Sequence, residues 1–87
     1  MLFQPGQIVA TPGALSLAER GVDLLECLQR HLNGDWGDLC GEDKAENEFS
    51  LKHGFRLLSA YNTHLGKLWI ITEADRSVTT FLLPEEY

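Results

Sequence analysis

Residues Phe55-Arg56-Leu57-Leu58-Ser59-Ala60-Tyr61-Asn62 begin the part of the chain that decides its fold. From this point the residue pattern repeats every two positions and becomes rich in β-branched and aromatic residues, which is typical of β-strands. The same pattern returns in residues 67–73 and 77–83. Only short segments, 64–66 and 74–76, separate the three, so we expect consecutive strands to pair antiparallel as a meander.

Both faces of this predicted sheet carry apolar side chains. Leu57 and Tyr61 alternate with Leu58, and Trp69 alternates with Ile70. We expect helices to cover one face, while the other face binds either the N-terminal strand or a partner. One functional alternative is therefore a structural or regulatory adaptor whose sheet face, including Tyr61 and Trp69, binds another protein or a second copy of the chain.

The first third of the chain predicts a short strand and two helices. Residues 7–10 have the pattern of a strand at a sheet edge. Thr11 precedes a proline and is a typical N-cap, which predicts a helix over residues 12–20. Asp23 is placed to cap a second helix, which begins near residue 24 and ends at a glycine ten residues later.

Residues 42–53 predict a third helix, which Gly54 ends. Its narrow inward stripe is expected to consist of Ala45, Phe49 and the stem of Lys52. The predicted fold is therefore one small α+β domain spanning residues 1–87, with two to three N-terminal helices packed on a three- to four-stranded antiparallel β-meander.

Composition and charge narrow the classes of function. The formal net charge of −6 opposes direct binding of nucleic acid, because such binding depends on Lys and Arg side chains that neutralise phosphates. No apolar run approaches the roughly 20 residues that cross a bilayer, so we expect a cytoplasmic protein that does not bind membranes. Cys27 and Cys40 are expected to be reduced thiols there, although an oxidising compartment would allow a disulfide. Neither a zinc site nor a cofactor is predicted.

Acidic residues cluster in one part of the chain. Residues 35–48 hold six of the thirteen Asp and Glu residues and a single lysine, Lys44. Such a cluster either solvates one face of a domain and caps its helices, or presents phosphate-like charge to a basic partner. Under the second interpretation Trp36 is an aromatic anchor if it is exposed, and otherwise it is a core residue. The predicted partner-binding residues are Asp35, Trp36, Asp38, Glu42, Asp43, Glu46 and Glu48, extended by Glu73 and Asp75.

Sequence motifs give little support to catalysis. The chain has no phosphate-binding glycine loop, no G-x-S-x-G and no H-E-x-x-H, and we do not expect an enzyme. A less favoured alternative is a metal-dependent nuclease. It would use His31 as a base and the carboxylates of Asp35, Asp38, Glu42 and Asp43, with Glu73 and Asp75 as further ligands. Cys27 and His31, four residues apart on a predicted helix, could also form a nucleophile pair.

Several strings resemble a family of small proteins carried on plasmids and integrative elements. They are GDWGDL at 34–39, LLSAY at 57–61, WIITEADRS at 69–77 and LLPEEY at 82–87, and the resemblance covers roughly residues 9–87. Such families include anti-CRISPR proteins, and the chain is similar to small acidic inhibitors of type I (I-C-like) systems. The resemblance implies a protein that binds a basic subunit of the effector complex, Cascade, and we expect this protein to be a monomer or a weak dimer. Its DNA-mimicking surface would then block DNA binding.

Overall fold

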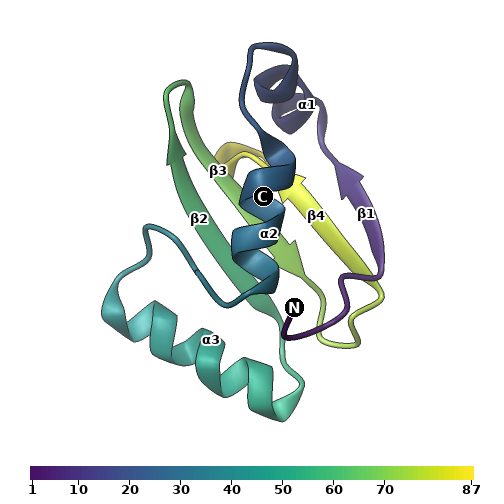
Figure 1. Ribbon diagram of the computed structural model, residues 1–87, viewed down its shortest axis with the longest axis vertical. Helices are drawn as coiled ribbons and strands as arrows, with labels where there is room; N and C mark the ends of the chain where they lie inside the picture. The colour runs from purple at the N-terminus through teal and green to yellow at the C-terminus, as the bar shows by residue number, and fades with distance from the viewer.

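Four strands form one mixed sheet in the order β1-β4-β3-β2 (Figure 1). The computed structural model describes residues 1–87. Strands β2 (Leu57–Thr63), β3 (Gly66–Thr72) and β4 (Val78–Leu82) make the predicted antiparallel meander. Strand β1 (Gln7–Ala10) lies at the sheet edge as expected, but it runs parallel to β4. The α+β fold is confirmed, and the parallel pair makes the sheet mixed.

Two helices cover one face of the sheet (Figure 1). They are α1 (Pro12–Glu19) and α2 (Leu24–Leu32), and both start at the predicted caps. The Thr11 side chain accepts a hydrogen bond from the N–H of residue 14, and the Asp23 side chain accepts one from the N–H of residue 26. Between the helices and the sheet lies the apolar core, composed of Ala14, Leu17, Val22, Cys27, Leu28, Tyr61, Leu68, Ile70 and Phe81.

The C-terminal turn closes over the start of α1. A short 3-10 helix, η1 (Pro84–Glu86), follows β4. The carboxylate of Glu86 accepts hydrogen bonds from the Thr11 hydroxyl at 2.5 Å and from the Gly13 N–H at 2.9 Å. It also accepts one from the Leu83 N–H at 2.8 Å. Residues from opposite ends of the chain thus share the cap of one helix.

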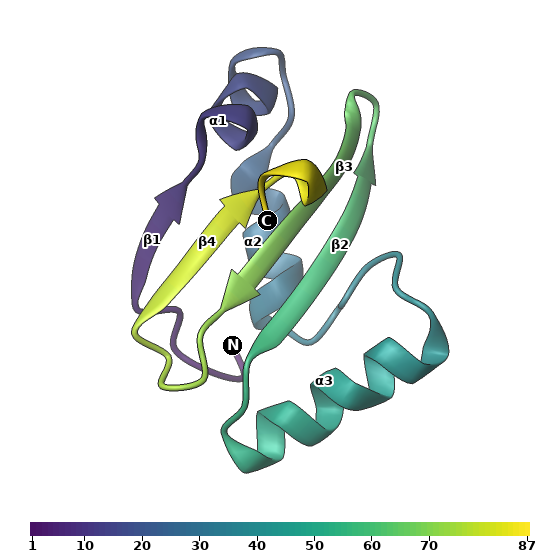
Figure 2. The same cartoon turned by 180° about the vertical axis from the view of Figure 1, so that it is seen from behind.

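Helix α3 (Gly41–His53) lies along the flank of the sheet, beside β2, and does not cover a sheet face (Figures 1 and 2). The predicted inward stripe is wrong, because Ala45, Phe49 and Lys52 are all exposed, and Phe49 is 54% accessible. The buried residues of α3 are Asn47 and Ser50, which are polar. A helix that packs against a strand edge meets backbone N–H and C=O groups, and polar side chains satisfy those groups better than apolar ones.

The outer edge of β2 is closed by hydrogen bonds from the loop before α3 and from α3 itself. The Ala60 N–H donates to the Trp36 carbonyl at 3.2 Å, and the Ala60 carbonyl accepts from the Asp38 N–H at 2.6 Å. The side-chain amide of Asn47 bonds both the carbonyl of Leu58, at 2.6 Å, and its N–H, at 3.1 Å. The open edge that would otherwise recruit another strand is therefore occupied.

Gly37 allows the loop to approach β2 this closely. Its φ is +76°, and a Cβ at this position would lie 2.1 Å from the carbonyl oxygen of Ala60. Gly54 at the end of α3 has nearly the same φ of +74°, yet nothing lies within 4 Å of its Cβ position. A comparison of the same substitution at these two glycines therefore separates the effect of backbone strain from that of a steric clash.

The other face of the sheet is open except where η1 and the C-terminal residue cross it (Figure 2). Trp69 and Leu58 lie on this face and are half-buried. Tyr61 is almost completely buried in the helix-covered core, where its hydroxyl donates to the Asp35 carbonyl at 2.7 Å. Tyr61 and Trp69 are therefore on opposite faces, and the expected adaptor surface containing both is wrong.

We predict that Gly37→Ala lowers the free energy of unfolding by about 3 kcal/mol, because strained φ and a clash with the Ala60 carbonyl add together. Gly54→Ala is the matched control and should cost only about 1 kcal/mol, from φ strain alone. Urea denaturation followed by circular dichroism measures both values. Equal losses in the two variants would show that the close approach of the loop to β2 contributes nothing.

Candidate functional site

Two carboxylates of the acidic stretch stabilise the loop that closes β2. Asp35 forms an ion pair with Arg30, with 2.7 Å between Oδ2 and Nε, and its Oδ1 accepts the Gly37 N–H at 3.2 Å. The hydrogen bond from Arg30 lowers the pKa of Asp35. Asp38 accepts the N–H of Asn62 at 2.7 Å, which continues the closure of the strand edge. Both side chains remain at the surface, but each has a structural partner.

Trp36 is a core residue, with only 3% of its surface accessible. Its indole Nε1 donates to Glu48 at 2.6 Å, which ties the loop to α3. The indole ring stacks on Phe3, with 6.5 Å between centroids, and meets the ring of His31 edge-on at 5.8 Å. The interpretation of Trp36 as an exposed anchor is therefore wrong, and Glu48 has a structural role.

The remaining carboxylates of the stretch are free. Glu42, Asp43 and Glu46 are exposed on the first half of α3, and none of them forms an ion pair or a side-chain hydrogen bond. Glu42 and Asp43 lie in the first helical turn, where negative charge is favourable by some tenths of a kcal/mol. The only cation in this part of the helix is Lys44. We call the exposed set of Glu42, Asp43 and Glu46 the acidic helix face.

Glu73 and Asp75 do not join this face. Arg76, in the same turn as Asp75, donates to the carbonyl of Ser50 at 3.3 Å, which places the turn beside the C-terminal part of α3. Glu73 is 3.6 Å from Arg56, so two cations lie near these carboxylates. The turn therefore lies beside the C-terminal part of α3, whereas Glu42, Asp43 and Glu46 lie in its first half.

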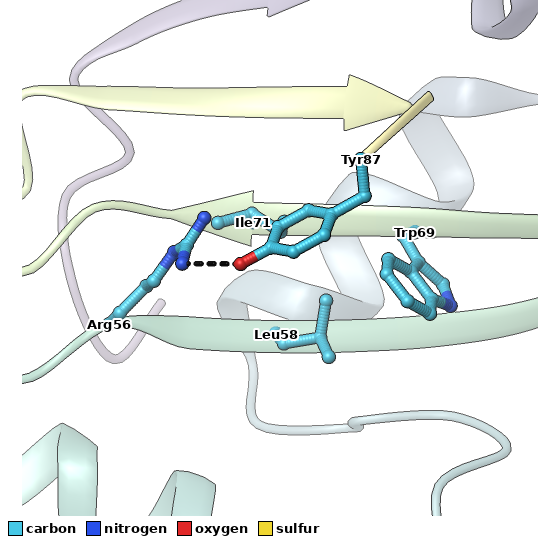
Figure 3. A pocket seen from close by; sticks show the side chains of 5 residues that line it. All are labelled: Arg56, Leu58, Trp69, Ile71 and Tyr87. Atoms are coloured by element: carbon cyan, nitrogen blue, oxygen red, sulfur yellow. Dashed lines mark hydrogen bonds between the residues drawn. The ribbon is translucent and has the colours of Figure 1, made fainter. Parts of the chain in front are cut away.

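A groove on the open side of the sheet connects with the acidic helix face. Its first part has a volume of about 310 Å³ and is mostly apolar (Figure 3). The hydroxyl of Tyr87 accepts a hydrogen bond from Arg56 at 2.8 Å, and the Tyr87 ring meets Trp69 edge-on at 5.8 Å. The lining residues are Arg56, Leu58, Trp69, Ile71 and Tyr87.

The second part of the groove is polar and has a volume of about 190 Å³. It shares Arg56 and Leu58 with the first part, so the two are neighbours. Its lining residues are Leu39, Asp43, Glu46, Asn47, Arg56 and Leu58. Two residues of the acidic helix face thus form one wall of a groove that is aromatic at its other end. The sequence indicated the apolar character of Trp69 and Leu58, but it gave no signal for the role of Arg56 or Tyr87.

A chain of hydrogen bonds runs through the protein interior. His31, which is fully buried, bonds Ser59 through Nδ1 at 2.5 Å and Thr72 through Nε2 at 2.9 Å. The hydroxyl of Thr72 lies 2.7 Å from that of Thr79, and the Thr79 hydroxyl donates to the carbonyl of Pro5 at 2.7 Å. The chain crosses β2, β3 and β4 and reaches the N-terminal segment.

The last hydrogen bond of this series, from Thr79 to the Pro5 carbonyl, determines where the protons of the whole series lie. Because Thr79 donates to a carbonyl, its oxygen must accept from Thr72, and Thr72 must in turn accept from Nε2–H of His31. Nδ1 then accepts from Ser59, so His31 is the neutral Nε2–H tautomer. Burial, aided by the positive charge of Arg76, lowers the pKa of His31 to about 4.

This arrangement does not bring the nuclease set together, and neither ring nitrogen of His31 is hydrogen-bonded to Cys27. His31 uses both ring nitrogens inside the core, whereas the carboxylates of the proposed nuclease set lie at the surface, with Glu73 partly buried and the others exposed. No group of three or more His, Cys, Asp or Glu side chains is arranged to hold a metal ion. Cys27 is a buried free thiol whose pKa is raised by burial, and Cys40 is an exposed free thiol. None of the helices has both the length and the apolar character needed to span a membrane.

Comparison of the chain with protein-family models, with curated proteins and with solved structures finds no match.

We predict that the free energy of unfolding falls by about 1.5 kcal/mol as the pH is lowered from 6.5 to 5. In the unfolded chain His31 gains a proton below its ordinary pKa of 6.5, but in the folded protein it does so only near 4. The unfolded state therefore binds more protons in this window, and acid favours unfolding. Urea denaturation at a series of pH values measures the slope.

His31→Gln should flatten this pH dependence, at a cost in overall stability, because glutamine does not titrate. His64→Gln is the control, since His64 is exposed, and it should keep the wild-type slope. The assignment of the slope to His31 fails if His31→Gln loses stability with acid as steeply as the wild type between pH 6.5 and 5.

Proposed function

We propose that the protein is a non-enzymatic inhibitor that binds a basic, nucleic-acid-binding surface of another protein through the acidic helix face. The observation that supports this most directly is that Glu42, Asp43 and Glu46 are exposed and unpaired on a helix at the flank of the domain. The other three carboxylates of the stretch have intramolecular partners. Fewer carboxylates are therefore unpaired than the composition suggests, but the unpaired ones all lie on one helix.

Electrostatics makes such a helix a competitor for nucleic acid. Proteins that hold DNA or RNA line their channels with Lys and Arg, and a row of carboxylates attracts those cations over a distance of about one Debye length. Association driven in this way needs no chemistry on the part of the inhibitor. It speeds encounter and weakens steeply with added salt.

The resemblance to proteins of mobile elements supplies the class of target. Within that setting the proposed partner is a DNA-binding subunit of a type I CRISPR effector, Cascade, in the cytoplasm of the host bacterium. The acidic helix face would occupy cations that otherwise hold the DNA phosphates. The same physical mechanism would serve any other protein with a comparably basic groove.

A second candidate function is that of an adaptor that binds a partner through the groove on the open sheet face. The 310 Å³ apolar part of that groove favours it, because pockets lined by aromatic side chains with a few polar groups are common binding sites. Trp69 and Tyr87 would then make the main contacts, and the acidic helix face would only set the orientation of the partner.

We predict that the double charge reversal Asp43→Lys with Glu46→Lys weakens inhibition of duplex DNA binding by a purified type I effector roughly tenfold or more. The wild-type protein should inhibit well at low salt and progressively less as the salt concentration rises. An electrophoretic or fluorescence competition assay gives the inhibition constant.

Glu19→Lys with Glu26→Lys is the matched control, because both residues are exposed on other helices and the net charge changes equally. This variant should retain most of the inhibition. If inhibition weakens equally in both variants, the effect comes from net charge alone, and a specific role of α3 is contradicted. Loss of binding on Trp69→Ser, with the α3 reversal silent, would instead support the adaptor.

A further inference from the structure

The two edges of the sheet differ in a way that points to a partner. The edge of β2 is closed by residues 36–38 and Asn47, whereas nothing lies beyond β1 in either view of the molecule (Figures 1 and 2). Unpaired edge strands usually carry charges, prolines or bulges that prevent pairing with another chain. Strand β1, with the sequence Gln-Ile-Val-Ala, carries no charge and no proline, and its short length of four residues is its main protection.

The backbone groups available on β1 follow from its register with β4. The N–H of Gln7 donates to Ser77, and the N–H of Thr11 donates to Phe81, at 3.0 Å each. In a parallel ladder alternate residues bond the same neighbour, so the N–H and C=O groups of Ile8 and Ala10 point away from β4. A short strand can therefore add to this edge.

The side chains of β1 are suited to an apolar contact on both faces. Ile8 is beside Thr79 in the register and so belongs to the helix-covered face, while Val9 is beside Thr80 on the open face. The accessible fractions are 47% for Ile8 and 37% for Val9. An added strand would bury both side chains.

Charge favours a second copy of the chain as the added strand. Residues 1–18 contain no charged side chain, although the whole chain carries a net charge of −6. The charged groups near the ends of the strand are Asp75 and Arg76 at its start and Glu86 at its end, and all three are hydrogen-bonded within the chain. Two copies can thus approach through β1 without bringing their acidic surfaces together, whereas a basic partner finds no counter-charge here.

We propose that two copies associate through antiparallel pairing of β1 with its symmetry mate, which makes one continuous eight-stranded sheet. With the two-fold axis at Val9, the outward groups of Ile8 bond those of Ala10 in the other copy, and the two Val9 side chains meet on the open face. Strand β1 has only four residues, and with this axis three of them pair with the other β1, so the dimer is weak, with a Kd of roughly 10 µM to 1 mM. This interface does not depend on the proposed inhibitory function.

Sedimentation velocity of the full chain from about 10 µM to about 1 mM tests the proposal over the expected range of Kd. The average mass should rise from 9.8 kDa toward twice that value. Ile8→Pro removes an outward N–H that β4 does not use, and it should leave a monomer at all concentrations. Val9→Lys places like charges opposite each other and should do the same. Leu25→Lys changes an exposed leucine on α2, 62% accessible, and should still dimerise.

Amide hydrogen exchange followed by NMR adds a measurement at single residues. The N–H groups of Ile8 and Ala10 should gain protection as the concentration rises, while those of Gln7 and Val9 are protected at every concentration. A protein that stays monomeric to about 1 mM overturns the proposal. So does a dimer that survives both Ile8→Pro and Val9→Lys, or one that only Trp69→Lys disrupts, because the interface would then be elsewhere.

Discussion

The hydrogen-bonding demand of the outer edge of β2 is the constraint on which the rest of the structure depends. A central sheet of this size has two edges, and unpaired N–H and C=O groups at an edge either recruit another strand or must be occupied. Here the Trp36 carbonyl, the Asp38 N–H and the Asn47 amide occupy them. This demand accounts for the glycine at position 37, because only glycine lets the loop approach β2 so closely. It also accounts for the burial of the Trp36 side chain, which the loop carries. It also explains why α3 lies on the flank: Asn47 must reach the backbone of β2.

Local rules predicted much of the fold. The period of two identified β2, β3 and β4, and the cap residues Thr11 and Asp23 located the starts of α1 and α2, because these signals act within a few residues. The inward stripe of α3 could not be predicted in this way. Its orientation depends on a strand edge more than ten residues away, so the local pattern favours Phe49 for the core, whereas the buried residue is Asn47.

The site was less predictable than the fold, because its properties arise from tertiary placement. The sequence showed the cluster of acids, but not that Asp35, Asp38 and Glu48 have intramolecular partners while Glu42, Asp43 and Glu46 have none. Likewise, the buried chain from His31 to Pro5 joins residues whose separation in the sequence hides their proximity. A histidine that looked available for chemistry is instead a neutral structural group.

The parallel pair of β1 with β4 and the cap that Glu86 places on α1 have a consequence for biosynthesis. Both contacts join residues more than 70 positions apart. During translation the N-terminal strand therefore leaves the ribosome well before β4 exists, and both of its edges stay unsatisfied until β4 has been synthesised. The nascent chain passes through an interval in which an uncharged, apolar strand is available to neighbouring nascent chains or to chaperones.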